Sequence, residues 1–94
     1  MEKRNLNAVL TKIMEECGET VQICSKCIFY GAGNTSPKGG NTRTNKEKLI
    51  EEMGDILANF KVLIDDTDIG ITWDEAWARA DAKYPKLEGY LPKA

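Results

Sequence analysis

Apolar residues recur at steps of three and four along three stretches of the chain, which is the spacing of one face of an α-helix. The pattern predicts helices over about residues 5–30, 45–68 and 72–84. Pro85 is expected to end the third helix, because the residue before a proline avoids helical geometry. No run of alternating β-branched residues predicts a strand. We therefore predict one all-α domain over residues 1–94, built as a helical bundle.

Local signals mark the ends of these predicted helices. Asn5 is placed to cap the start of the first helix, and Gly31 is placed to end it. The stretches TNKE at 44–47 and TWDE at 72–75 both fit the S/T-x-x-E capping box, in which two side chains satisfy the first N–H groups of a helix. The second and third helices therefore have well-defined starts.

A long loop over residues 31–44 joins the first two helices, and it is rich in glycine, asparagine and threonine. Loops of this length in compact domains are often functional. It contains no GxxxxGK[ST] phosphate-binding motif. Lys38 and Arg43 in this loop can close over phosphates, although charged loop residues are more often simply solvated.

The size and charge of the chain exclude several classes of protein. A chain of 94 residues buries only about 60–65% of its unfolded surface, so we expect a second copy to complete the core, in a homodimer or homotetramer. Its 13 basic and 15 acidic residues argue against a partner that is a nucleic-acid polymer. No apolar run is long enough to span a membrane, and the charged start lacks the features of a signal peptide. We therefore expect a cytoplasmic protein without a membrane partner.

The cysteines and the lack of histidine narrow the chemistry further. Cys17, Cys24 and Cys27 fall on one helical face, as small core residues would. The last two form a CxxC pair, but a single pair inside a helix is a weak zinc or redox signal. The chain has no histidine, which removes the Ser-His and Cys-His arrangements of nucleophilic catalysis. Catalysis by this chain would have to use carboxylates, lysines and a metal ion.

Two acidic motifs, EECGE from residue 15 and EEMGD from residue 51, interrupt the helical patterns. At about 100° per residue, Glu16 and Glu19 share one flank of the first apolar stripe, and Glu52 and Asp55 share the same flank of the second. Helices packed through these stripes would gather four carboxylates, which repel one another without a cation. Mg²⁺ is the obvious cation because it prefers oxygen ligands. The plain alternative is that these acids are part of a solvated helix surface.

The same two motifs resemble those of the MazG-type all-α nucleoside triphosphate pyrophosphohydrolases, which carry EExxE, a spacer and then EExxD. The resemblance covers about residues 5–65, and GDILANF is similar to the helix that holds the family's second motif. The compact form is similar to small MazG-like proteins often encoded by phages. The spacer is longer than in many members, and the 31–44 loop accounts for the difference.

The resemblance implies a hydrolase that cleaves a ribo- or deoxynucleoside triphosphate to the monophosphate and pyrophosphate. It implies that Mg²⁺, or Mn²⁺ in its place, is held by Glu16, Glu19, Glu52 and Asp55. Glu15, beside these ligands, would hold a second metal ion or orient the attacking water. Cations and a positioned water are what phosphoryl substrates need, since these substrates bring their own negative charge.

Four further residues are candidates for binding the substrate. Lys26 lies on the flank that carries the acids and can meet a phosphate oxygen, although a surface ion pair is an equal alternative. Asn59 can hydrogen-bond the sugar or base, or can be a satisfied polar group at a helix interface. Tyr30 can stack on a base, with packing the stronger alternative, and Lys83 loosely matches a basic position that the family directs towards phosphates.

Two other interpretations remain open from the sequence. The chain can be a non-catalytic helical module that binds a nucleotide or a protein. It can also be a purely structural bundle, in which replacing the acids by amides would be neutral or stabilising. Nothing in the sequence distinguishes the base or sugar of the nucleotide.

Overall fold

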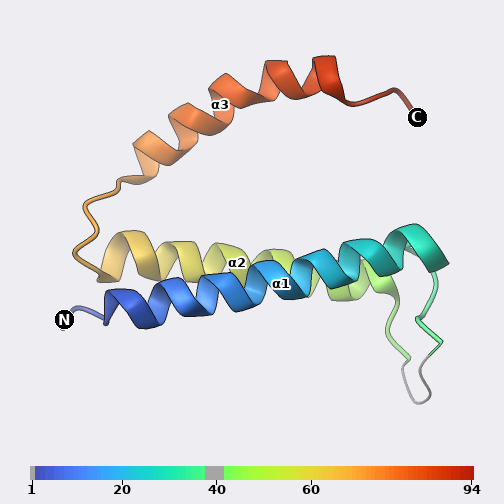
Figure 1. Ribbon diagram of the computed structural model, residues 1–94, viewed down its shortest axis with the longest axis horizontal. Helices are drawn as coiled ribbons and strands as arrows, with labels where there is room; N and C mark the ends of the chain where they lie inside the picture. The colour runs from blue at the N-terminus through green and yellow to red at the C-terminus, as the bar shows by residue number, and fades with distance from the viewer. Residues whose placement is uncertain (1, 38–41) are drawn as a thin grey trace.

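The computed structural model describes residues 2–37 and 42–94, and these residues form three helices and no strand. The helices are α1 (Leu6–Tyr30), α2 (Asn45–Asp66) and α3 (Trp73–Tyr90). The first two form an antiparallel hairpin, and α3 runs separately from it (Figure 1). The prediction of an all-α fold is confirmed.

The starts of all three helices and the end of α1 are made by the residues that the sequence indicated. The Asn5 side chain accepts a hydrogen bond from the backbone N–H of Ala8 at 2.9 Å. Gly31 ends α1 with a φ of 90°, a conformation that favours glycine, and its N–H donates to a carbonyl of the last turn. Complete capping boxes start α2 at Thr44 and α3 at Thr72.

Pro85 does not end the third helix, so this prediction is wrong. The helix α3 continues through Pro85 to Tyr90. A proline inside a helix removes the hydrogen bond to the carbonyl of Asp81, four residues earlier. Every residue around this turn is exposed, so water can satisfy that carbonyl.

The helices of the hairpin do not pack through the centres of their apolar stripes. The buried apolar residues are Val9 and Ile23 of α1 and Leu63 of α2. With Ile13 at zero and about 100° per residue, Val9 lies near 320° and Ile23 near 280°, so their mean direction is about 60° from the centre of the stripe. Other apolar residues of the two helices are exposed and form a face that is here called the outer face of the hairpin, which includes Leu10, Val21, Ile28, Ile50, Met53 and Leu57.

The exposure of the cysteines follows from this offset between the buried line of α1 and the centre of its apolar stripe. Cys17 and Cys24 are exposed, and Cys27 is half-buried. The prediction that all three are core residues is therefore wrong for the first two within a single chain. Both lie on the outer face of α1, which α2 does not cover.

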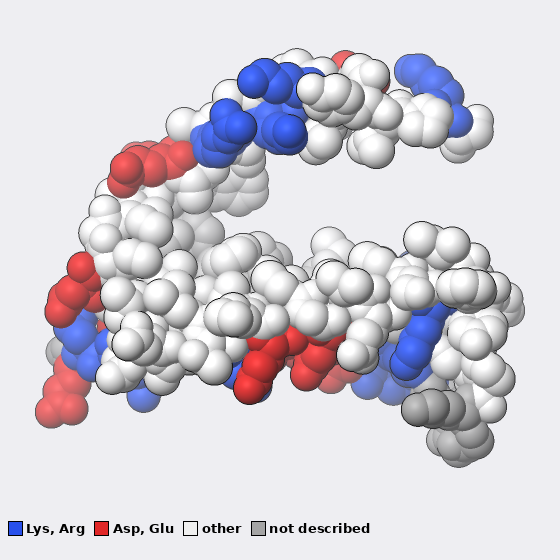
Figure 2. All heavy atoms as spheres, in the orientation of Figure 1, with Lys and Arg blue, Asp and Glu red and all other residues white. Residues whose placement is uncertain are grey.

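The third helix is left without a packing partner in the chain. No residue of α3 is buried, and an open gap separates it from the hairpin (Figure 2). The radius of gyration is 16.3 Å, against about 12 Å for a compact chain of this length. No helix in the described part of the chain is long and apolar enough to cross a membrane.

Candidate active site

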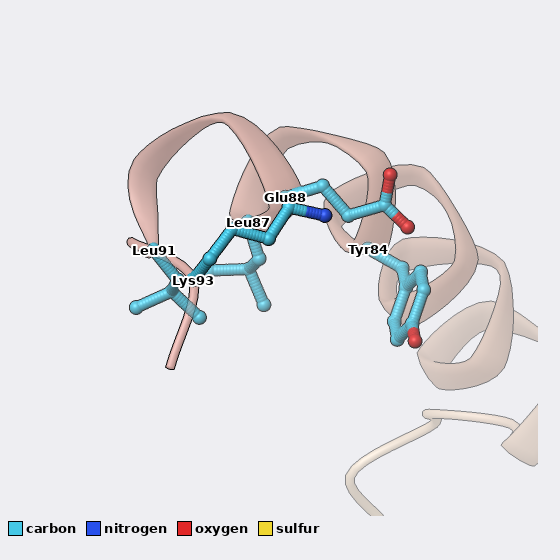
Figure 3. A pocket seen from close by; sticks show the side chains of 5 residues that line it. All are labelled: Tyr84, Leu87, Glu88, Leu91 and Lys93. Atoms are coloured by element: carbon cyan, nitrogen blue, oxygen red, sulfur yellow. The ribbon is translucent and has the colours of Figure 1, made fainter.

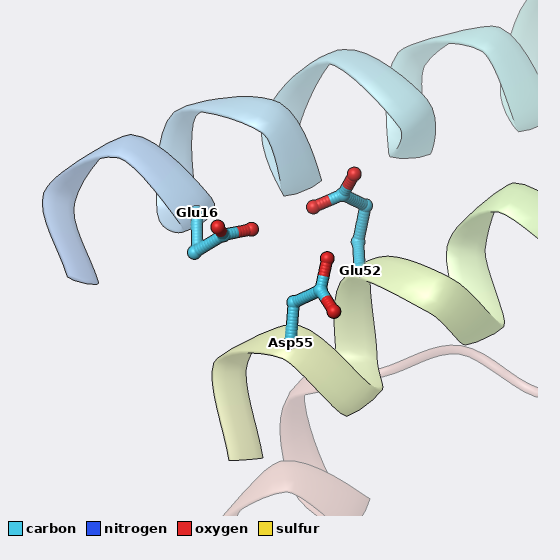
Figure 4. Close-up of side chains that lie close together, drawn as sticks. All are labelled: Glu16, Glu52 and Asp55. Atoms are coloured by element: carbon cyan, nitrogen blue, oxygen red, sulfur yellow. The ribbon is translucent and has the colours of Figure 1, made fainter. Parts of the chain in front are cut away.

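Three of the predicted carboxylates come together between α1 and α2. Glu16 reaches from α1, while Glu52 and Asp55 reach from successive turns of α2, and all three point toward one another (Figure 4). One oxygen from each lies within 4.8 Å of the others. The spacing Glu-x-x-Asp places the two α2 acids on one side of that helix, as the sequence predicted.

Two oxygen atoms of this cluster are buried without a partner. Glu16 is only 5% exposed, because it lies between Val9 and Ile23 on the line of α1 that faces α2. Within the described residues, neither its Oε2 nor the Oε2 of Glu52 has a hydrogen-bond partner. A buried polar atom left in this way costs about 1–3 kcal/mol, so the cluster is suited to a cation that would supply the missing interaction.

The electrostatics of Glu52 reflect the same crowding. The pKa of its carboxyl group is raised from 4.5 to about 7, mainly because of burial and next because of the nearby charge of Glu19. Hydrogen bonding and charge from Glu16 act in the same direction. A bound cation would favour the ionised form and bring this pKa down.

Lys12 is a member of the site that the sequence reading missed. Its Nζ lies 3.5 Å from Oε1 of Glu16 and 3.2 Å from Oε2 of Glu15. The two carboxylates raise the pKa of this lysine. Its position three and four residues before two glutamates was a signal for such pairs. Lys12 thus partly neutralises the charge of Glu16 through its Oε1, while Oε2 of Glu16 remains without a hydrogen-bond partner.

The two other predicted acids lie at the edge of the cluster. Glu19 is exposed and close enough to influence Glu52, but it is outside the group of three that lie within 4.8 Å of one another. Glu15 is 58% exposed and is paired with Lys12. Their roles as a metal ligand and as a catalytic residue stay predictions.

A hollow of about 290 Å³ adjoins the carboxylates, on the side nearer the loop between α1 and α2. Lys26 lines it, as expected for a residue on the flank of the acids, and so does Arg43 of the loop; Lys38 lies outside the described residues. Lys48, which the sequence reading missed, precedes Glu52 by one helical turn. The full lining is Glu19, Gln22, Ile23, Lys26, Arg43, Lys48, Glu51 and Glu52.

The other candidates for substrate binding are not gathered in this hollow. Asn59 is half-buried one turn after Asp55, and its side-chain N–H donates to the Asp55 carbonyl at 2.8 Å. Tyr30 packs its ring near that of Phe29, with centroids 6.3 Å apart. Lys83 extends over the ring of Tyr90 on α3, so a single chain does not bring it to the carboxylates.

A larger hollow, of about 460 Å³, lies at the end of α3 (Figure 3). One helix and its tail form it, from Tyr84, Leu87, Glu88, Leu91 and Lys93. It contains a single carboxylate and none of the residues of the two acidic motifs. The convergence of carboxylates, and not the size of the hollow, therefore identifies the site.

The described residues thus form an all-α hairpin in which two acidic motifs face each other across the seam, and three of their carboxylates could hold a metal ion. The family model of the MazG nucleotide pyrophosphohydrolase domain matches residues 4–88, and the chain belongs to this family. No curated protein and no solved structure matches the chain. The family resemblance seen in the two motifs is confirmed, and membership indicates a nucleotide pyrophosphohydrolase.

Proposed function

We propose that this protein is a Mg²⁺-dependent hydrolase, with Mn²⁺ as an alternative ion, that cleaves a nucleoside triphosphate to the monophosphate and pyrophosphate. In this reaction water adds across the bond between the α and β phosphates. The elements of water are divided between the two products, so no further reactant is needed. Membership of the family supports the class of reaction, and the cluster of carboxylates supports the choice of residues.

The observation that carries this proposal is the pair of buried oxygens without partners. Oε2 of Glu16 and Oε2 of Glu52 lie in the seam of the hairpin, and a purely structural seam would bury apolar groups there instead. Carboxylate oxygens are the donors that Mg²⁺ and Mn²⁺ prefer. The residues present therefore fit a divalent cation.

Each acid has a role in this proposal. Glu16, Glu52 and Asp55 hold the cation, and Glu19 completes the ligand set from the next turn of α1. Glu15 orients the attacking water or helps to hold a second cation. A bound cation would neutralise the phosphates and help to activate the water.

Lys12 partly neutralises the negative charge of the carboxylates from the solvent-exposed side of the site. By pairing with Glu15 and Glu16, it holds these two side chains in place from the preceding turn of α1. The residue therefore favours one orientation of Glu16, with Oε1 toward Lys12 and Oε2 toward the seam.

We also propose that the working form is a homodimer or homotetramer. The chain exposes 7372 Å², which is about 2,000 Å² more than a compact protein of this mass exposes. A stable interface between permanent partners covers an area of this order on each chain. The outer face of the hairpin and the apolar side of α3 supply that area, and a second copy has both.

The experiment that tests the activity offers a panel of ribo- and deoxynucleoside triphosphates to the purified protein, with and without Mg²⁺. Chromatography of the products is expected to give monophosphate and pyrophosphate, only with metal. Diphosphate and phosphate would mean that a different bond is cleaved. No turnover of any nucleotide would favour the alternative, a non-catalytic module that binds a nucleotide or a protein.

A further inference from the structure

The hollow beside the carboxylates has an uneven distribution of charge along the hairpin. Along α1, Lys26 lies seven residues beyond Glu19, toward the loop. Along α2, which runs the opposite way, Lys48 lies one turn before Glu52, also toward the loop. Figure 2 shows acidic atoms in the middle of the hairpin and basic atoms between them and the loop end. Within the hollow, the cations therefore lie on the loop side of the acids, whereas Lys12 on the opposite side is already paired with Glu15 and Glu16.

The two lysines are placed for an anion. Both are half-buried, and neither forms an ion pair with any residue within 2–37 and 42–94. Most lysines on a helical surface extend into water or pair with a carboxylate one turn away. Lys26 and Lys48 instead border the same concave surface from different helices.

Arg43 is the third cation of the hollow, and the structure fixes its place. Its guanidinium lies 2.8 Å from Glu51. The chain around it is held by Asn45, which is fully buried and accepts from Ser36 at 2.8 Å while donating to the carbonyl of Gly31 at 3.1 Å. The arginine is thus held at the rim of the hollow by its ion pair and by the anchored start of α2.

We propose that Lys26, Arg43 and Lys48 bind the terminal phosphates of the substrate, the part that leaves as pyrophosphate. This inference rests on the proposed function and gives the substrate a direction in the site. The α phosphate lies at Glu16, Glu52 and Asp55, and the β and γ phosphates extend toward the loop. The nucleoside then lies on the opposite side, toward Asn59.

The charges of the hollow agree with this assignment. Its three cations are balanced by Glu19, Glu51 and Glu52 in the isolated chain. Two of these acids, Glu19 and Glu52, are proposed ligands of the cation, so metal binding leaves the loop end of the hollow positive. Arginine and lysine both bind phosphate, the first through a planar fork of donors and the second as a point charge.

Calorimetric titration with pyrophosphate in the presence of Mg²⁺ tests the proposal directly on the full chain. Arg43→Gln and Lys48→Gln are each expected to weaken pyrophosphate binding by about tenfold or more, with little change for the nucleoside monophosphate. Lys61→Gln is the matched control, because Lys61 pairs with Asp65 on α2 and does not line the hollow. Circular dichroism of each variant verifies that the helices are intact.

The outcomes separate this inference from the proposed function. Selective loss of pyrophosphate binding in the two variants, with the control unchanged, supports the subsite. Equal binding by the variants and the wild type overturns it, and so does an absence of pyrophosphate binding to the wild type. In both of these cases, hydrolysis of nucleoside triphosphates by the wild type would leave the proposed function standing.

Discussion

The hairpin of α1 and α2 buries apolar residues between its own two helices, whereas the third helix buries none within the chain. The hairpin has a seam of its own, with Val9, Ile23 and Leu63 buried and a polar anchor at Asn45. Helix α3 has a complete capping box and an apolar side, yet none of its residues is buried. Most of the stability of a helix in a protein comes from packing of its apolar face, which α3 lacks within the single chain. The difference teaches that local signals define where α3 forms, while its stability must come from a second surface.

The hairpin also differs from α3 in where it places charge. It buries carboxylates in its seam, where they reduce stability, whereas α3 keeps its charged residues in solvent. Buried acids that repel one another destabilise a fold, and such groups are typical of active sites and not of purely structural elements. The following predictions test this contrast, from the largest expected effect to the smallest.

Glu52→Gln is expected to lower kcat/KM by at least about a thousandfold, because a neutral amide cannot replace a carboxylate that holds a cation. The far-ultraviolet circular dichroism should be unchanged. Glu88→Gln makes the same chemical change on α3 and should leave the rate near that of the wild type. Turnover by Glu52→Gln close to the wild-type rate would contradict the assignment of this residue.

Trp77→Asp is expected to convert the oligomer to a single chain, because Trp77 is 60% exposed here and lies on the apolar side of α3. Light scattering after size-exclusion chromatography measures the mass of the assembly. Ala82→Asp places the same charge about 140° around the helix from Trp77 and should leave the mass unchanged. A wild-type protein that elutes as one chain would refute the proposed oligomer.

Asn45→Ala is expected to lower the free energy of unfolding by about 1–3 kcal/mol, because it leaves buried partners such as the Ser36 hydroxyl unsatisfied. Thermal melts monitored by circular dichroism give the change. Asn7→Ala removes the same amide from an exposed position of α1 and should have little effect. Equal melting temperatures for the two variants would mean that Asn45 does not anchor the loop.

The stability of the metal-free protein is expected to fall as pH rises from about 4.5 to 7. The pKa of Glu52 is about 7 in the folded chain, against an ordinary value of 4.5. Between these values the folded state binds more protons than the unfolded state, so the slope of stability with pH is negative. Melts in a chelator should show this decline, and Mg²⁺ should reduce it. A Glu52→Gln variant with the same pH slope would assign the effect to another group.

The sequence was sufficient for much of the fold because the helix ends depend on local interactions. Asn5, Gly31 and the two capping boxes lie within a few residues of the groups that they satisfy, so their effect is visible without tertiary structure. The same locality explains the error at Pro85. A proline weakens a helix at one turn, but an exposed helix tolerates the loss, and exposure is not visible in the sequence.

The candidate site was predictable in its acids and less so in its cations. The spacing of EExxE and EExxD places each set of carboxylates on one helical flank, which depends only on the geometry of an α-helix. Lys48 carries no comparable motif, and its role emerges only when two helices are placed side by side, whereas the spacing of Lys12 to Glu15 and Glu16 was a local signal. Lys83 shows the reverse case, since a loose family match predicted a site residue that one chain does not bring there.

By itself, the sequence determined the helices, the capping residues, the family and the flank of each helix that carries the acids. Only the tertiary structure decided that α1 and α2 meet through a line about 60° from the centre of the apolar stripe. That rotation places Glu16 in the seam and leaves Cys17 and Cys24 outside. The physical reason is that periodicity defines the faces of a helix, whereas the choice of which face meets which neighbour depends on all the surfaces available for burial. For this protein those surfaces include α3 and, as proposed, a second copy of the chain.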